Sequence, residues 1–313
     1  MFGSLSFIER IRLKRILVTG AGGFIGSRVV EALLNRGATV RALVAAPGEY
    51  ARVLRSPSLE NCRADINDAA ALEHLTDEID VVVHMAGPPS VATSFDEPAV
   101  FARIHAAGTA TVLSACRKAG VNRFVYVSSA EVYGRPQTSL VSEDHPLAPR
   151  SPYGAAKASA EHFVHVFATS FGISSVILRP FSVYGPDSSP ASVVATILRM
   201  ARFEDAVVLN DLAPVRDYCF VEDVADAILR ACVVPVAGVA TFNIGSGAGV
   251  SVGDLAKAVL RVLGRNIPVA ERQDRRRPET AEIYTLMADR SRASKILGWE
   301  PTTNLESGIR HCI

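Results

Sequence analysis

Short apolar runs alternate with longer helical patterns through the first 180 residues of the chain. Runs rich in β-branched residues predict strands at 15–19, 39–44, 79–87, 122–129 and 174–180, with one more before Asp65. Between them, length and periodicity predict helices at 23–36, 98–119 and 151–171. Because the strands lack polar alternation, both faces of their sheet should be covered, as is typical of parallel strands in βαβ units.

A glycine-rich segment lies at the first strand–helix junction. The sequence VTGAGGFIGS (18–27) places Gly20, Gly23 and Gly26 in a G-x-x-G-x-x-G pattern. Gly20 permits the tight turn, Gly23 lets a pyrophosphate approach the backbone, and Gly26 lets the helix pack close to the sheet. The N-terminus of the helix then offers free N–H groups to the phosphates. The segment therefore predicts a dinucleotide site.

The pattern of strands and helices becomes less regular after Pro180, where prolines and glycines separate shorter elements. We predict an α/β protein with a doubly wound parallel sheet, the Rossmann fold, in a dinucleotide-binding domain over residues 1–176. Residues 177–313 are expected to form a smaller C-terminal substrate-binding lobe, some segments of which return to the first domain. Such a lobe would cover the carboxyl ends of the strands, where open α/β sheets bind ligands.

The end of the second strand bears on the type of cofactor. An acidic residue at this point usually accepts a hydrogen bond from the ribose 2′-hydroxyl of NAD, whereas an arginine suits the 2′-phosphate of NADP. Here the strand ends in Val44, Ala45 and Ala46, with neither group. Asp65 and Ile66, after the third strand, are candidates for the adenine edge, and Asp65 is equally suited to a turn. The pattern favours NAD and leaves NADP open.

Composition limits the partners that we expect. With 33 basic and 32 acidic residues, the charge balance indicates neither a nucleic-acid-binding protein nor one that binds anionic membranes. The five cysteines are far apart and contain no C-x-x-C, so neither a metal site nor a disulfide framework is predicted, and reduced thiols suit the cytoplasm. The charged residues Glu9 and Arg10 lie in the N-terminal segment where a signal peptide needs an uninterrupted apolar core, so no signal peptide is expected. No apolar stretch approaches the ~20 residues of a membrane span, so no membrane association is expected.

A second segment has the residues for acid–base chemistry. SPYGAAKASAEHF (151–163) contains Tyr153 and Lys157, which project from one helix face because they are four residues apart. Ser151 can cap this helix and Pro152 fits its first turn. A neighbouring ammonium and a positively charged nicotinamide would both favour the phenolate of Tyr153, whose unperturbed pKa is ~10. The spacing by itself also fits a surface tyrosine and a solvated lysine.

Together these segments resemble the extended short-chain dehydrogenase/reductase family, in particular its NAD-dependent nucleotide-sugar epimerase/dehydratase group, with UDP-glucose 4-epimerase-like features. The resemblance runs through nearly the whole chain. It is carried by TGAGGFIGS, HMAG (84–87), SVATSFDEP (90–98), GTATVLSACRKAGVNRFVYVSSAEVYG (108–134), SPYGAAK, LRPFSVYGP (178–186), RDYCFVEDVADAI (216–228), FNIGSG (242–247) and DRSRASKILGWEP (289–301).

The resemblance implies roles for individual residues. Ser129 matches the hydroxyl that hydrogen-bonds the oxygen being oxidised, Tyr153 the base, and Lys157 the lysine that holds the nicotinamide ribose. Glu131 is implied as a further acid/base group. The implied cofactor-binding residues are Gly20, Gly23, Phe24, Ile25, Gly26, Asp65, Ile66, Met85, Ala86, Gly87, Tyr153 and Lys157. The implied substrate-binding residues are Ser90, Ser129, Ser182, Arg216 and Arg277, the two arginines facing the substrate diphosphate.

The activity implied is 4-epimerisation of a nucleotide-diphosphate sugar through a transient 4-keto sugar, with NAD as cofactor. The same ketone also serves nucleotide-sugar 4-ketoreductases, dehydratases and decarboxylases, which are the alternatives, in that order. A catalytically silent dinucleotide-binding sensor is the alternative outside enzymes. Relatives pair through helices that match 98–119 and 151–171, so the resemblance also implies a homodimer.

Departures from the family pattern narrow these alternatives. The 4,6-dehydratases have an Asp before the Glu, and here Ala130 precedes Glu131. Glucuronate-acting members often have an Arg after YGP, whereas Asp187 here is expected to repel a sugar carboxylate. Three further positions differ from many members: Ser182 for an Asn, His105 for the Asn before GT, and Leu209 for an aromatic residue that stacks on the base. The sugar and the base stay open.

Overall fold

The computed structural model describes residues 6–45, 56–272 and 283–313. Its centre is a seven-stranded sheet in the order β11-β7-β5-β4-β1-β2-β3, in which all neighbours are parallel. The strands are β1 (Arg15–Thr19), β2 (Thr39–Val44), β3 (Leu59–Arg63), β4 (Val81–His84), β5 (Arg123–Val127), β7 (Ser174–Pro180) and β11 (Val239–Ile244).

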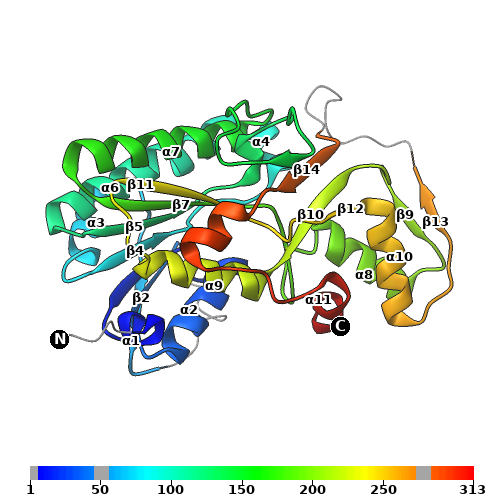
Figure 1. Ribbon diagram of the computed structural model, residues 1–313, viewed down its shortest axis with the longest axis horizontal. Coiled ribbons are helices and arrows are strands. Elements are labelled where there is room, and N and C mark those ends of the chain that lie inside the picture. The colour runs from blue at the N-terminus through cyan, green and yellow to red at the C-terminus, as the bar shows by residue number, and fades with distance from the viewer. Residues whose placement is uncertain (1–5, 46–55, 273–282) are drawn as a thin grey trace.

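Helices cover both faces of this sheet (Figure 1). In β1, Ile16 and Val18 pack with helices α1 (Phe7–Arg12), α2 (Phe24–Asn35) and α9 (Val221–Val233). The intervening Leu17 packs on the opposite side with α3 (Ala69–Leu75), α6 (Gly108–Ala119) and α7 (Pro152–Phe171). Successive strand side chains alternate between the faces, so a wholly apolar strand requires cover on both. The predicted doubly wound parallel sheet is confirmed.

A smaller lobe lies beside the large sheet (Figure 1). Its main sheet has the order β12-β10-β14-β6, and β8 pairs with β10. These strands are β6 (Leu140–Val141), β8 (Ser182–Tyr184), β10 (Val215–Phe220), β12 (Gly249–Ser251) and β14 (Thr285–Ala288). Helices α8 (Val193–Phe203), α10 (Val252–Leu263) and α11 (Leu305–His311), with the strand pair β9 (Val207–Leu209) and β13 (Val269–Glu271), complete the lobe. It has its own apolar core, which includes Ile197, Tyr218 and Leu255.

Short helical segments occupy the connections. They are α4 (Val91–Asp96), α5 (Pro98–Phe101), the π-helix η2 (Ala102–Ala107), the 3₁₀-helix η3 (Ala130–Val132) and the π-helix η5 (Ala293–Leu297). The segments α5, η2 and α6 follow one another without a break, where one helix over 98–119 was predicted.

The predicted division of the chain at residue 176 falls inside β7, and β11 from the later part of the chain pairs with β7 in the large sheet. Strand β6, from the earlier part, pairs with β14 of the smaller lobe. The two parts of the chain therefore exchange strands, and the assignment of separate roles to them stays a prediction.

The helical stretch Pro98–Ala119 is long and apolar enough to cross a membrane by length and composition, and 44% of its tested window is buried. We expected no stretch to approach that length, and on this criterion the expectation was wrong. Core helices of soluble proteins have the same properties, and Val112 and Leu113 of this stretch pack against the large sheet.

A buried ion pair fixes α7 to the sheet. The carboxylate of Glu161 on α7 accepts hydrogen bonds from Nε (3.0 Å) and Nη2 (2.6 Å) of Arg179 on β7, and their side chains are only 1% and 6% exposed. The same carboxylate accepts a 2.5 Å hydrogen bond from the hydroxyl of Ser128, which follows β5. One carboxylate thus holds the helix against two neighbouring strands.

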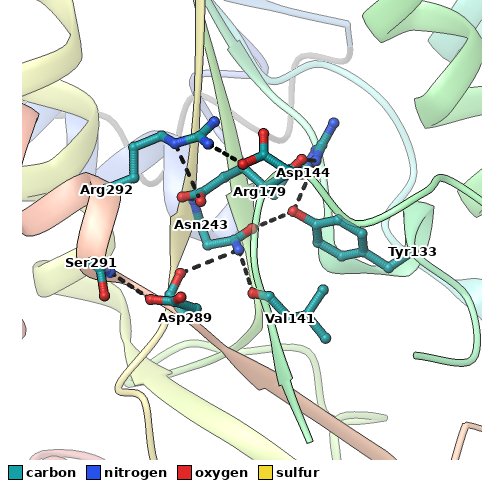
Figure 2. Close-up of polar contacts among 9 residues, drawn as sticks. Tyr133, Val141, Asp144, Arg179, Asn243, Asp289, Ser291 and Arg292 are labelled. Atoms are coloured by element: carbon teal, nitrogen blue, oxygen red, sulfur yellow. Dashed lines mark hydrogen bonds and ion pairs between the residues drawn. The ribbon is translucent and has the colours of Figure 1, made fainter. Parts of the chain in front are cut away.

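The network extends from Arg179 toward the smaller lobe (Figure 2). Nη1 of Arg179 donates to the hydroxyl of Tyr133 (2.8 Å), which donates to Oδ1 of Asn243 on β11 (2.6 Å). The Asn243 side-chain amide donates to the carbonyl oxygens of Val141 on β6 (2.7 Å) and Asp289 (3.3 Å). Tyr133 and Asn243 therefore bridge the edge of the large sheet and the β6–β14 pair.

We expect Glu161→Gln to lower the free energy of unfolding by about 3–5 kcal/mol, because it leaves the Arg179 guanidinium buried without a counter-charge. Urea unfolding followed by circular dichroism measures the loss. Glu73→Gln is the matched control, because Glu73 pairs with Lys118 through exposed side chains. It should cost no more than about 1 kcal/mol. Equal, small losses in both variants would show that the buried pair carries no special stability.

Candidate active site

A cleft of about 1560 Å³ lies at the carboxyl ends of β1, β4 and β5 and is lined by residues of both the large sheet and the smaller lobe. A single drug-sized ligand occupies ~300–1,000 Å³, so this space suits two ligands side by side. Every described residue that the sequence assigned to catalysis, cofactor binding or substrate binding lines it. Arg277 lies outside the described residues.

The glycine segment forms one end of the cleft. Gly20 has φ +70°, and a Cβ there would lie 2.9 Å from the backbone of Ala86 on the neighbouring β4 loop. A Cβ on Gly26 would lie 2.1 Å from the carbonyl oxygen of Gly20. Gly23 is the N-cap of α2 and has no side chain to cap the first N–H groups, which leaves them for an anion. This cradle, in which a Cβ would clash at Gly20 and at Gly26, fits a dinucleotide pyrophosphate.

Asp65 and Ile66 line the end of the cleft beyond β2 and β3. Oδ1 of Asp65 accepts hydrogen bonds from the backbone N–H (2.9 Å) and side-chain amide (2.8 Å) of Asn67, so Asp65 is a turn residue as well. Its Oδ2 lies 3.8 Å from Nη1 of Arg103 across the cleft. These contacts, the backbone hydrogen bond first, lower the pKa of Asp65.

The three predicted catalytic groups converge where β5 meets the first turns of α7. Ser151 caps this helix by accepting a 3.1 Å hydrogen bond from the N–H of Gly154, and Pro152 occupies its first position, as predicted. Ser129 hydrogen-bonds the Tyr153 hydroxyl. Nζ of Lys157 lies 6.0 Å from the centre of the Tyr153 ring and donates to the carbonyl oxygen of Val127 (2.8 Å).

Burial sets the protonation of this group. It raises the pKa of Tyr153 to about 12, with the Ser129 hydrogen bond acting in the opposite direction. Burial also lowers the pKa of Lys157 to about 7, opposed by the negative charge of Glu161. We expected the ammonium to lower the tyrosine pKa. In the protein alone burial is the largest influence on the Tyr153 pKa and raises it, and the Ser129 hydrogen bond is the influence that lowers it.

His105 is packed against Tyr153, the predicted catalytic tyrosine. It belongs to the π-helix η2, and such segments are frequent at functional sites. Its ring contacts that of Tyr153 edge-on, with centroids 5.4 Å apart, and its Nε2 lies 3.0 Å from the carbonyl oxygen of Pro88. A carbonyl can only accept, so Nε2 carries the proton. A Cβ on Gly87 would lie 2.2 Å from this ring, which explains the glycine.

The neighbouring residues Ala130 and Glu131 lie in different surroundings. Glu131 lines the cleft, and its backbone N–H donates to the Ser129 hydroxyl oxygen (3.2 Å). Ala130 is 3% exposed and packs with Val132 and Tyr133. No second carboxylate therefore stands beside Glu131 at this position.

Polar groups of the smaller lobe line the other side of the cleft. Arg216 on β10 and Ser182 on β8 are both there. Ser90 also lines the cleft but comes from the connection after β4, where it is the N-cap of α4 and accepts from the N–H of Thr93 (3.1 Å). Leu209, at the expected base-stacking position, also lines the cleft. The structure thus brings the predicted substrate-binding residues to the same cavity as the catalytic group.

Sequence analysis missed several lining residues of this lobe. They are Arg199, Asn210, Tyr218, Arg272 and Tyr284. Nε of Arg272 donates to Oδ1 of Asn210 (2.8 Å), and the buried hydroxyl of Tyr218 has no hydrogen-bond partner among the described residues. The only signal in the sequence was the position of Tyr218 two residues after Arg216. The others belong to no motif.

The expectation for Asp187 was wrong. Its exposed carboxylate pairs with Nη2 of Arg28 on α2 (2.9 Å), and Asp187 is not among the residues that line the cleft. The charge of Asp187 is therefore paired with an arginine, and the residue is outside the lining of the cleft.

Comparisons with known proteins agree with this geometry. A model of the NAD dependent epimerase/dehydratase family matches residues 16–245. UDP-glucose 4-epimerase of Mycolicibacterium smegmatis is 33% identical over 94% of this chain and 96% of its own. The structure of Thermotoga maritima UDP-glucose 4-epimerase with UDP-glucose has a TM-score of 0.85 at 32% identity, covering 95% and 97% of the two chains. MoeE5 in complex with UDP-glucuronic acid and NAD has the same values.

A buried histidine beneath the cleft predicts a pH dependence. The hydroxyl of Thr109 donates to the carbonyl oxygen of His105, so it accepts from Nε2 of His84 (3.0 Å), while Nδ1 of His84 accepts from Thr19 (2.7 Å). The Thr19 oxygen in turn accepts from the N–H groups of Met85 (3.2 Å) and Ala86 (3.3 Å). Burial lowers the pKa of His84 to about 3.

Since the folded pKa lies below the unfolded value, the unfolded chain binds more protons between pH ~6.5 and 3, and stability is lost as the pH falls through this range. We expect His84→Gln to reduce the loss between pH 6.5 and 4.5 by about 2 kcal/mol, at about 1.4 kcal/mol per pH unit. Denaturant unfolding at both pH values measures it. His162→Gln, on the exposed face of α7, is the control. An unchanged slope in His84→Gln would refute this assignment.

Proposed function

The chain belongs to the NAD-dependent epimerase/dehydratase family, and from that premise we propose that it is a nucleotide-sugar 4-epimerase with NAD as its cofactor. The observation that carries the proposal is the convergence of Ser129, Tyr153 and Lys157 in the cleft that also contains the glycine cradle. A catalytically silent sensor would not need the Ser129, Tyr153 and Lys157 group. Nor would it need the polar wall that the smaller lobe adds to the cleft.

In the proposed reaction, Tyr153 removes the proton of the sugar C4 hydroxyl, and Ser129 hydrogen-bonds the same oxygen as it becomes a ketone. NAD, when bound, supplies the oxidised ring that accepts a hydride from C4 and returns it. The protonated tyrosine then gives its proton back to the oxygen. Return of the hydride to the opposite face of the sugar inverts the carbon, so the atoms of substrate and product are the same.

The electrostatics of the cleft suit such a cycle. A buried phenol with a pKa of about 12 is a poor base, and a cationic ring bound beside it favours the phenolate. Lys157, anchored to Val127 at the end of β5, would hold the ribose of the cofactor and add positive charge. The catalytic base is then active only when the oxidised cofactor is in place.

UDP-sugars are the proposed substrates, because the relatives described above act on or bind them. The guanidinium of Arg216, with those of Arg199 and Arg272 on the same wall, suits the diphosphate. Both neutral sugars and uronic acids are candidates, since Asp187 does not face the cavity. Glu131, which faces the cavity, is proposed as a second acid/base group.

We further propose a cytoplasmic homodimer. Helix α7 packs along α6 and exposes Phe163, Val166 and Phe171, which are 39%, 52% and 43% exposed. Apolar side chains gathered on one helix are typical of a protein–protein interface. The five cysteines are all free thiols, in keeping with a reducing compartment.

Tyr153→Phe is expected to lower kcat by at least about 100-fold, because general acid–base catalysis contributes 10²–10⁴-fold, while NAD stays bound. Purified protein is incubated with UDP-glucose, UDP-galactose, UDP-glucuronic acid and the N-acetylated UDP-sugars. The products are separated by chromatography, and their masses are measured by mass spectrometry. An epimerase leaves the mass unchanged, a dehydratase loses water, a decarboxylase loses carbon dioxide, and a ketoreductase consumes reduced cofactor. Full activity of the phenylalanine variant would overturn the role of Tyr153.

Val166→Lys should convert the dimer to a monomer in size-exclusion chromatography with light scattering, because a charge buried at the interface is unpaired. Phe203→Glu is the control, since Phe203 is 80% exposed on α8, in the other lobe. A dimer that survives Val166→Lys and dissociates with Phe203→Glu would place the interface elsewhere.

A further inference from the structure

The ammonium of Lys157 is buried without an ion-pair partner. The residue is 4% exposed, and Nζ donates to the carbonyl oxygen of Val127. Among the described residues no carboxylate forms an ion pair with it. Glu161, one turn further along α7, favours the ammonium by its charge, but its carboxylate is already held by Arg179 and Ser128. A buried charge needs compensation, so a further group should support this one.

The face of an aromatic ring lies next to the ammonium. Nζ stands over the ring of Tyr126 at 5.0 Å from its centre, closer than the 6.0 Å to the ring of Tyr153. Tyr126 belongs to β5, is 1% exposed and lies in the apolar core between the large sheet and α7. A cation over an aromatic face within ~6 Å of its centre is attracted by the negative charge of the ring, most strongly where both are desolvated. The distance and the burial are those of a cation–π interaction.

The hydroxyl of Tyr126 contributes little to this contact. It lies near Thr109 but has no hydrogen bond of ordinary geometry among the described residues. The Thr109 hydroxyl instead donates to the carbonyl oxygen of His105 and accepts from His84. What Tyr126 presents to the ammonium is therefore its ring.

The other titratable groups around the ammonium do not supply negative charge. Burial lowers the pKa of His84 on β4 and of His105 on η2 to about 3, so both are neutral near pH 7. Burial raises the pKa of Tyr153 to about 12, so this phenol is neutral as well in the protein alone. The Glu161 charge is shared with Arg179. The Tyr126 ring is thus the group whose negative face is free for Lys157.

We infer that the face of the Tyr126 ring supports the positive charge of Lys157 and holds its ammonium at the end of β5. Tyr126 is not among the residues that line the cleft, so it is a positioning residue that acts through Lys157. An ammonium has three N–H donors, and Val127 accepts from one, which leaves donors for the ribose of the cofactor. The inference rests on the proposed function and adds Tyr126 to the group that carries it.

The direct test follows the titration of the lysine itself. Full-length protein is labelled with ¹³C at the lysine ε-carbons, the NMR signal of each lysine is recorded against pH, and Lys157→Met identifies the signal of Lys157. Tyr126→Leu removes the ring and should lower the pKa of Lys157 by about one unit or more, the size expected of a desolvated cation–π contact. Tyr126→Phe keeps the ring and should leave the pKa within about 0.3 units of the wild-type value.

Phe124→Leu is the matched control. Phe124 is buried on the same strand, two residues before Tyr126 and in the same core, and no cation stands over its ring among the described residues. Its loss should leave the pKa of Lys157 unchanged. A second series keeps the shape of the ring, in case Tyr126→Leu does not fold: phenylalanine with one, two or three fluorines at position 126. Fluorine withdraws charge from the ring face, so the pKa of Lys157 should fall with each fluorine.

Turnover of a UDP-sugar gives a second readout. If the Lys157 pKa values are about 7 in the wild type and about 6 in Tyr126→Leu, the ratio of their charged fractions changes about fivefold between pH 6 and pH 8. We expect kcat of Tyr126→Leu relative to wild type to fall by this factor over that range and to recover at the lower pH. KM for the sugar should stay the same, because Lys157 faces the cofactor. A purely structural defect would lower kcat equally at both pH values.

The outcomes separate this inference from the proposed function. An unchanged Lys157 titration in Tyr126→Leu, or one that is indifferent to the fluorine series, refutes the support by Tyr126, and turnover by the wild type would still establish the enzyme. If the titration shifts as expected and no UDP-sugar is turned over, the contact stands and the proposed function fails.

Discussion

The buried pair between Glu161 and Arg179 is the interaction on which the geometry of the site depends. Helix α7 carries Tyr153, Lys157 and Glu161 at intervals of four residues, so all three lie on one face of it. The last of them is held by Arg179 on β7 and by Ser128, the residue before Ser129. Fixing this carboxylate fixes the register of the helix against the strand after which Ser129, the proposed catalytic hydroxyl, follows. A charge pair taken out of water contributes little net stability, and its value here is geometric.

The same desolvation shapes the chemistry. Tyr153 and Lys157 are both buried, and burial shifts the pKa of the phenol up and that of the ammonium down, so each is pushed toward its neutral form. In a water-filled site both pKa values would lie nearer to their ordinary values, and the electric fields would be weaker. In a low-dielectric cleft, one added cation has a large effect on the phenol. In the proposed reaction, the strength of Tyr153 as a base would then depend on what is bound beside it.

The two walls of the cleft are built differently. The wall from the large sheet includes backbone at Gly20 and Gly26, where a Cβ would clash, and at the N-terminus of α2, beside the side chains of Tyr153 and Lys157. The wall from the smaller lobe includes the long side chains of Arg199, Arg216 and Arg272. A backbone cradle recognises a pyrophosphate by shape, whereas side chains can differ among relatives and select the sugar and base. This division fits a family whose members share a cofactor and differ in substrate.

Much of the fold was readable in the sequence because its signals are local. The strands at 15–19, 39–44 and 174–180 were predicted with the observed limits, since short runs rich in apolar and β-branched residues have few alternatives. The cap of α7 by Ser151 and the turn at Gly20 likewise depend on neighbouring residues. The convergence of the implied site residues followed from a general rule, that ligands bind at the carboxyl ends of parallel strands.

What the tertiary structure alone decided concerns residues that meet across long stretches of chain. Asp187 was expected to face the sugar and instead pairs with Arg28, 159 residues away. Tyr133 meets Asn243 across 110 residues, and Arg63 reaches Ala45 through the pairing of β3 with β2. Periodicity states which face of a helix or strand a residue occupies. Periodicity does not show which distant element packs on that face. The partner of a charged side chain follows only from that packing.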